Sequence, residues 1–401
     1  MNDDTWRSVR SRRRFLAAVG AAGIGGLAGC NQGDDGGSGG GTAEETRADT
    51  GDGSSGDGTA GGSGEQIGSG RSPFGDRDIS GGVSMTELPD LSGELTLYSG
   101  RGEALVGELV TYIEELYPDF TVRPRYNSAA DLVNQIFTEG SSSPADVFFT
   151  VNAGALGALA DEGRTGTLPD EVLDMVPDGF HDPDGRWIGT SGRARTIPFN
   201  TDALSDSDVP TDIMAFPDTE AFRDDVGWAP TYSSFQAFVT AMRVLEGEEA
   251  TREWLQGMLD LGVTEYSDEF LVSQAVADGE ISAGFANHYY IQRVLAGRPD
   301  APISTAFTDG DAGAIFNVAG ACSLDTASDD DLAANFVRHL LSAEAQDYFA
   351  RTTFEYPLVP GVDPIGRLPS IDELNPPDEL DLTQLSDLEG TISLLRDVGV
   401  L

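Results

Sequence analysis

The chain has 401 residues, more than one ordinary hydrophobic core accommodates, so we expect about two folded units with tails. Its formal net charge is -44, from 68 acidic and 24 basic residues, and every basic residue is an arginine. Such a surface excludes nucleic acid as a partner and is typical of a salt-loving organism (a halophile), where concentrated salt screens exposed charge.

The N-terminal segment is typical of an export signal. The basic cluster Arg12–Arg14 precedes an apolar run of small residues that is too short to span a bilayer as a helix. Ser11–Leu16 resembles a twin-arginine signal, and Leu27–Cys30 resembles a lipobox, in which the cysteine carries lipid after cleavage. We therefore expect residues 1–30 to be a twin-arginine lipoprotein signal that anchors the protein to the outer face of the cell membrane through Cys30.

Residues 31–92 are rich in Gly, Ser, Asp and Thr and poor in apolar residues, which predicts a disordered linker that tethers a folded domain. The second cysteine of the chain is Cys322. If Cys30 is lipidated, no intramolecular disulfide can form. The apolar neighbours of Cys322 favour a small buried hydrophobic residue.

Segments with strand and helix patterns alternate from residue 93 onward, which indicates a largely parallel sheet covered by helices. Residues 186–201 read as two extended runs interrupted at Gly192. We expect strands at 93–100, 120–126, 145–150, 226–231 and 281–286. We expect helices at 103–118, 128–140, 153–163, 234–247, 249–262, 269–279 and 289–297.

The sequence contains no motif of a common enzyme class. No nucleophile elbow, Walker loop or H-E-x-x-H motif occurs in a suitable setting, and the three histidines, His181, His288 and His339, are far apart. Acidic pairs carry no information in so acidic a chain. We therefore expect a protein that is not an enzyme.

Tyr289 and Tyr290 stand side by side where a helix is expected to begin, directly after Asn287 and His288. A phenol with a pKa near 10 does not ionise at neutral pH unless a highly charged cation binds it, and a phenolate is a hard oxygen donor that suits Fe(III). The dipeptide alone leaves two interpretations open: a metal site, or one ring in the core and the other exposed.

A second helix is expected to begin at Ser233 and Ser234. Small hydroxyl residues and free N–H groups at a helix start favour either an anion site or ordinary N-capping. Tyr232, in the turn before them, would add a third phenol to the site.

Residues 93–364 resemble the periplasmic ferric-iron-binding proteins of ABC transporters, which are extracellular solute-binding proteins. The resemblance implies an α/β, two-lobed periplasmic-binding-protein-like (type II) fold, with a mixed sheet flanked by helices in each lobe and a two-strand hinge about which the lobes close. Six stretches carry the resemblance in the family's order: LTLYSGRGEAL, PADVFFTVNAGALGAL, TSGRARTIPFNT, GWAPTYSSFQAFVTAMRVL, AVADGEISAGFANHYY and HLLSAEAQDYFARTTFEYPLVPGVDP.

The resemblance also implies a ligand set. Tyr289 and Tyr290 match the family's iron-binding pair, with Tyr232 as a further donor. A carbonate or phosphate would bind beside the metal at a group of polar residues: Ser233, Ser234, Asn287, Arg101 and Arg193, or Arg195. Many family members carry a histidine at the position of Gly102 and a glutamate at that of Val151, so the first lobe here lacks both protein ligands.

We interpret the chain as a monomeric lipoprotein of an ABC importer that captures Fe(III) and delivers it to the permease. The first lobe is expected at 93–195 and 315–355, and the second at 196–314 and 356–401. Two alternatives stay open: the same fold binding another small solute (phosphonate, thiamine, polyamine or another anion), and a secreted hydrolase.

Overall fold

The computed structural model describes residues 66–68, 74–75, 77–377, 380–386 and 388–401, all within one compact unit, Thr59–Leu401. The expected signal with Cys30, and most of the expected linker, lie outside the described residues. Among the helices of the described part, none combines the length and the apolar character needed to cross a membrane.

One hydrogen-bonded path of strands runs through the unit. The strands are β1 (Gly93–Ser99), β2 (Phe120–Tyr126), β3 (Val147–Thr150), β4 (Ile188–Asn200), β5 (Val226–Trp228), β6 (Thr264–Glu265), β7 (Ala283–Gly284), β8 (Ala286–Asn287), β9 (Ile303–Ala306) and β10 (Phe316–Ser323). Their order is β2-β1-β3-β10-β4-β7-β5-β6, with β8 and β9 also paired to β4. β1 is parallel to β2 and β3, and β5 to β6 and β7, whereas β10 is antiparallel to β3 and β4.

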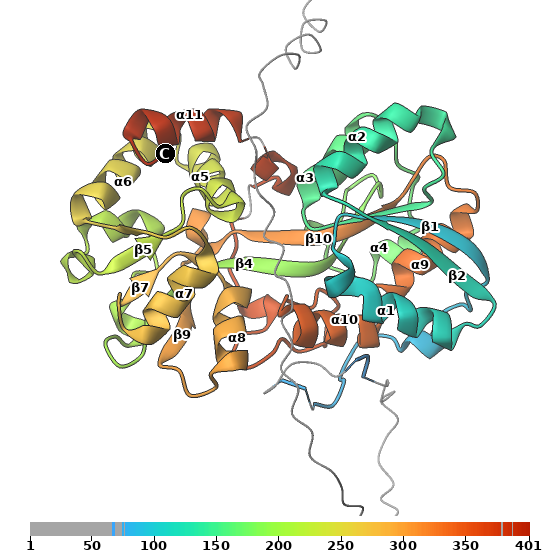
Figure 1. The fold of residues 1–401 in the computed structure, drawn as a ribbon, viewed down its shortest axis with the longest axis horizontal. Coiled ribbons are helices and arrows are strands. Elements are labelled where there is room, and N and C mark those ends of the chain that lie inside the picture. The colour runs from blue at the N-terminus through green and yellow to red at the C-terminus, as the bar shows by residue number, and fades with distance from the viewer. Residues whose placement is uncertain (1–65, 69–73, 76, 378–379, 387) are drawn as a thin grey trace, which may run out of the picture. The chain divides into compact units, whose positions relative to one another are not determined.

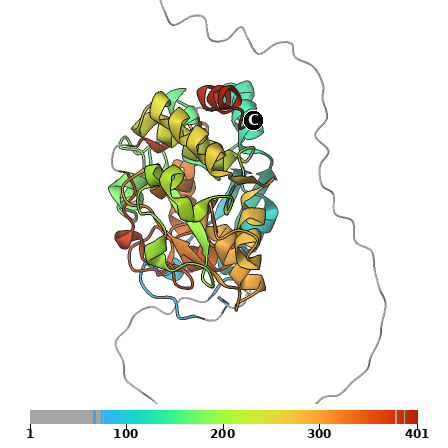
Figure 2. The ribbon, with the colours of Figure 1, turned by 90° about the vertical axis from the view of Figure 1, so that its left-hand side faces the viewer.

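Helices cover this sheet on both sides (Figure 1). They are α1 (Glu103–Leu116), α2 (Ala129–Glu139), α3 (Ala153–Asp161), α4 (Asp170–Leu173), α5 (Ser233–Leu245), α6 (Glu248–Leu261), α7 (Glu269–Asp278), α8 (His288–Gly297), α9 (Asp330–His339), α10 (Ala343–Tyr348) and α11 (Glu389–Val398). The predicted helices are all present, whereas α4, α9, α10 and α11 were not among them. Helix α11, red in Figure 2, packs on α5 and α6.

Two hydrophobic cores define two lobes. The first core includes residues from β1 through Ala194 and again from Phe316 to Val362. The second core begins at Ile197, continues to Ile315 and takes in residues of α11. The mixed α/β, two-lobed class is therefore confirmed. The exact lobe boundaries stay a prediction, although Tyr356, which we assigned to the second lobe, packs in the first core.

Strand β4 connects the two lobes without a break. Its first half pairs with β10 and its second half with β7, β8 and β9 (Figure 1). The predicted interruption at Gly192 is wrong, because Gly192 pairs with Val318 inside the strand. Packing requires a glycine at this position, because a Cβ on Gly192 would lie 2.0 Å from the ring of Phe316.

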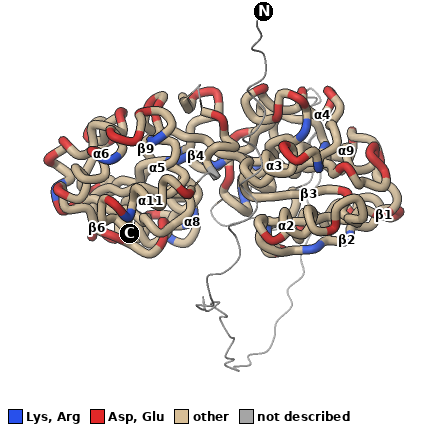
Figure 3. Tube along the Cα trace, turned by 90° about the horizontal axis from the view of Figure 1, so that it is seen from above, with Lys and Arg blue, Asp and Glu red and all other residues tan. Residues whose placement is uncertain are grey.

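Acidic residues are spread over both lobes and are not confined to one tail (Figure 3). Cys322 lies fully buried in β10, as predicted, and burial raises the pKa of its thiol to about 12. The thiol is therefore a packing group and not a reactive one at neutral pH.

The histidine of α9 predicts how stability depends on pH. His339 is buried against the ring of Tyr117, and burial lowers the pKa of its imidazole to about 4. The unfolded chain, with a histidine pKa of about 6.5, binds this proton more readily. Because the folded pKa is the lower one, the stabilisation is present above pH ~6.5 and is lost as the pH falls toward the folded pKa.

We expect His339→Gln to reduce the drop in the free energy of unfolding between about pH 6.5 and about pH 5 by about 1.5 kcal/mol. Denaturant unfolding of parent and variant in concentrated salt at both pH values measures this drop. An equal drop in the two proteins would contradict the assignment.

Candidate functional site

A cavity of ≈ 320 Å³ is lined by residues from both lobes. The first lobe contributes the start of α3, and the connecting strands contribute Arg193 and Asn317. The second lobe contributes the starts of α5 and α8. The lining residues are Val151, Asn152, Gly154, Arg193, Tyr232, Ser233, Ser234, Ala237, Asn287, Tyr289, Ile315, Asn317, Leu382, Leu385 and Leu388.

The three predicted tyrosines come together at this cavity. The rings of Tyr289 and Tyr290 lie with their centroids 4.4 Å apart, at an interplanar angle of 49°. The hydroxyl groups of Tyr232 and Tyr290 are hydrogen-bonded to each other, and the centroids of these rings are 6.0 Å apart. Tyr232 and Tyr289 line the cavity, and Tyr290 lies buried behind them. Neither ring of the pair is an exposed surface side chain.

The start of α8 is held by buried polar contacts. The N–H of Asn287 donates to the carboxylate of Glu269 at 2.9 Å. The Nδ1 of His288 accepts the N–H of Ala194 at 3.1 Å, and its Nε2–H donates to the carbonyl of Phe354 at 2.8 Å. Burial lowers the pKa of His288 to about 4, so the ring is neutral and carries one donor and one acceptor. These contacts hold the first turn of α8 in place and so fix the orientation of Tyr289 and Tyr290.

Tyr289 and Tyr290 are protonated when no cation is present. Burial raises the pKa of Tyr289, although the nearby Arg193 guanidinium lowers it in part. The pKa of Tyr290 is raised far above its ordinary value, first by burial and then by the neighbouring Tyr289 and Tyr232. A ligand that takes phenolate donors must therefore bring enough positive charge to displace these protons.

The polar groups beside the tyrosines suit an anion. Ser233 and Ser234 are the first two residues of α5, and their side chains line the cavity. The N-cap position is occupied by Tyr232, so the alternative that either serine caps this helix is wrong. The hydroxyl of Ser234 has no hydrogen-bond partner within the described residues. Hydroxyl and N–H groups at a helix start, with an arginine opposite, favour negative charge.

Asn287 occupies the N-cap position of α8, but its side chain does not cap the helix. Its Nδ2 donates instead to the hydroxyl of Tyr289 at 3.3 Å. Asn287 also lines the cavity, together with Tyr289, Ser233 and Ser234.

Two of the arginines considered for the anion do not reach the cavity. The buried guanidinium of Arg101 donates to Ser191 at 3.0 Å and to Glu355 at 2.6 Å. Arg195 is likewise buried and pairs with Glu269 in the second lobe. Arg193 is the arginine whose side chain lines the cavity.

Glu269 and Glu355, which pair with these arginines, were not predicted from the sequence. No signal marks them in a chain with 68 acidic residues. Val151 lines the cavity with an apolar side chain, and Gly102 is exposed and outside it. In the part of the chain that the structure describes, no three His, Cys, Asp or Glu side chains gather to hold a metal ion. Among the residues that line the cavity, Tyr232 and Tyr289 carry the phenol oxygens.

The chain is similar to several known proteins. A profile described as bacterial extracellular solute-binding protein matches residues 142–377. The major ferric iron-binding protein of Neisseria meningitidis is 29% identical over 329 residues, which covers 79% of this chain and 96% of that protein. Iron uptake protein A2 of Synechocystis is 32% identical over 257 residues, covering 59% of this chain and 72% of that protein. Iron-bound HitA from Pseudomonas aeruginosa superimposes with a TM-score of 0.65 at 28% identity, over 78% of this chain and 100% of that one.

The buried ion pair between Arg195 and Glu269 tests what stabilises the start of α8, because Glu269 also accepts the N–H of Asn287. Glu269→Gln leaves the charge of Arg195 buried without a counter-ion, and such a loss costs about 3 kcal/mol in the free energy of unfolding. We expect this destabilisation in denaturant unfolding in concentrated salt. Glu220→Gln, which breaks an exposed pair with Arg223, is the matched control and is expected to change stability far less. Equal effects of the two changes would contradict the role of Glu269.

Proposed function

Because the chain belongs to the family of bacterial extracellular solute-binding proteins, which bind solutes and are not enzymes, we propose that it captures Fe(III) outside the cytoplasm for an ABC importer. The observation that carries this proposal is the convergence of the three phenols, those of Tyr232, Tyr289 and Tyr290, at one cavity. The related proteins named for ferric iron support it.

The phenols account for a preference for a trivalent cation. Each hydroxyl must give its proton to solvent as its oxygen binds the metal, and the raised pKa values of Tyr289 and Tyr290 oppose this loss. A monovalent or weakly binding divalent ion offers too little charge to reverse such shifts, whereas Fe(III) is a hard, highly charged partner for phenolate oxygen. Capture should therefore release protons.

A bound anion would complete the coordination of the metal. By the resemblance, Gly102 and Val151 stand where many family members have a histidine and a glutamate. Glycine has no side chain and that of valine is apolar, so neither residue offers a side-chain donor to a metal. A carbonate or phosphate at Ser233, Ser234 and Arg193 would supply oxygen ligands and offset charge.

The two-lobed fold supports a mechanism for delivering the iron to the permease. The cavity lies between residues of both lobes, so a ligand that contacts both stabilises the closed arrangement. The permease would then recognise the closed protein, and opening or loss of the anion would release the iron. The lipid on Cys30 would keep the monomeric protein near the permease.

We expect the purified protein in concentrated salt to develop a visible phenolate-to-iron charge-transfer band when ferric ion is added with phosphate or carbonate. Tyr289→Phe combined with Tyr290→Phe should strongly diminish the band and weaken iron binding by more than about 100-fold, because two of the three phenolate donors are lost and Tyr232 alone remains. Absorbance titration and metal analysis measure the two effects.

Tyr112→Phe is the matched control, since Tyr112 lies half-buried on α1 outside the cavity. Its band should equal that of the parent. Undiminished iron binding by the double variant would refute the tyrosine assignment. A different small solute in the mass spectrum of the protein purified in native salt, with no ferric band, would favour a solute other than iron.

A further inference from the structure

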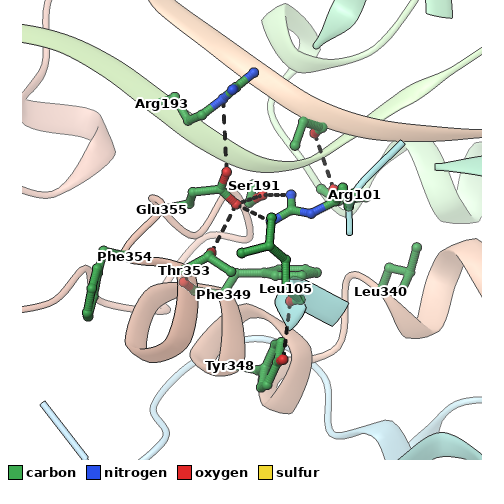
Figure 4. Close-up of polar contacts among 12 residues, drawn as sticks. Arg101, Leu105, Ser191, Arg193, Leu340, Tyr348, Phe349, Thr353, Phe354 and Glu355 are labelled. Atoms are coloured by element: carbon green, nitrogen blue, oxygen red, sulfur yellow. Dashed lines mark hydrogen bonds and ion pairs between the residues drawn. The ribbon is translucent and has the colours of Figure 1, made fainter. Parts of the chain in front are cut away.

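A buried ion cluster lies beside the cavity and reaches it through one residue. At its centre is Glu355, whose Oε2 accepts hydrogen bonds from Arg101 at 2.6 Å, Ser191 at 2.7 Å and Thr353 at 3.0 Å. Figure 4 shows Glu355 between Arg101 on one side and Arg193 on the other. Of the two arginines, Arg193 lines the cavity.

The carboxylate is shared unequally between the two arginines. Oε1 of Glu355 lies 4.0 Å from Nε of Arg193, which is too long for a hydrogen bond. Nε of Arg193 is buried and has no hydrogen-bond partner within the described residues. Arg101 is thus held to Glu355 by a short hydrogen bond, whereas Arg193 is attracted to the same carboxylate at longer range.

The surrounding fold prevents Arg101 and Glu355 from rearranging freely. Gly192 and Tyr356 exchange two backbone hydrogen bonds of 2.8 Å, which places Glu355 against β4. The guanidinium of Arg101 lies 5.2 Å from the ring centroid of Phe149 and 5.0 Å from that of Phe349.

The cluster therefore carries one surplus positive charge. Although burial opposes ionisation, Arg101 and Arg193 hold the pKa of Glu355 below its usual range, so one carboxylate faces two guanidinium groups. Since the carboxylate is hydrogen-bonded to Arg101, the surplus charge resides on Arg193. This charge points to the cavity, where it is screened less than a charge on the outer surface.

We propose that Glu355 and Arg101 are positioning residues that set how much positive charge Arg193 presents to an anion in the cavity. The inference rests on the proposed function, in which the cavity takes an anion beside the metal. Neither Glu355 nor Arg101 lines the cavity, so each acts through Arg193.

The proposal requires opposite effects from two substitutions. Glu355→Gln removes the shared carboxylate and leaves Arg193 unopposed, so an anion binds more tightly. Arg101→Gln frees the carboxylate to pair fully with Arg193, so an anion binds more weakly. Residues with a merely structural role would weaken binding in both cases.

The probe is inorganic phosphate, titrated by calorimetry into the metal-free and the ferric-loaded protein in concentrated salt. We expect Glu355→Gln to tighten phosphate binding about threefold to tenfold and Arg101→Gln to weaken it by a similar factor. Glu171→Gln and Arg338→Gln change the same charges in a surface pair of the first lobe, with 3.2 Å between the charged groups, and should leave the affinity within about twofold of the parent.

Thermal unfolding of each variant checks that it folds. If Arg101→Gln does not fold, tighter binding by Glu355→Gln still supports the proposal, because a damaged fold does not raise affinity. If Glu355→Gln does not fold, Glu355→Asp withdraws the carboxylate from Arg193 and should shift the affinity in the same direction.

Effects in the same direction, equal shifts in the surface controls, or no phosphate binding by the parent in either state would overturn the inference. A ferric charge-transfer band in the parent that accompanies any of these results would leave the proposed function standing. Absence of that band would instead remove the proposed function itself.

Discussion

A strand that leaves one core and enters another needs backbone partners along its whole length, because an unpaired buried N–H or C=O costs about as much as a lost hydrogen bond. Strand β4 meets this constraint by changing partners: β10 pairs with it up to Ala194, and β8 takes over at Arg195. At this change the N–H of Ala194 is also accepted by His288. The start of α8, which carries the tyrosine pair, is therefore fixed by the strand that joins the lobes.

The same strand carries two arginines, one in the buried interior and one at the cavity. Arg195 pairs with Glu269 inside the second lobe, whereas Arg193, two residues earlier, lies 4.0 Å from the carboxylate of Glu355 and lines the cavity. Burying a charge is tolerated when a partner compensates for it, so the positions of Glu269 and Glu355 determine which arginine remains available. The cavity therefore combines the phenols of Tyr232 and Tyr289 with the guanidinium of Arg193, and the proposed capture of a cation with an anion depends on this combination.

Local patterns predicted much of the fold because they depend on near neighbours in the chain. Helical periodicity located α1 to α3 and α5 to α8, and the adjacent phenols of Tyr289 and Tyr290 marked the candidate site. The break expected at Gly192 was wrong, since a glycine in a strand signals either an interruption or close packing, and here the ring of Phe316 occupies the space. The cap expected at Ser233 was wrong because Tyr232 takes that position.

By itself, the sequence determined the strand–helix alternation, the buried character of Cys322 and the pairing of two phenols at a helix start, since each depends on residues close together in the chain. The tertiary structure decided which charges meet. Arg101 turns inward to Glu355, 254 positions away, and Tyr232 bonds to Tyr290 across 58 positions. Such contacts cannot be read from spacing, because long-range pairing depends on how the strands and helices pack and not on local preference.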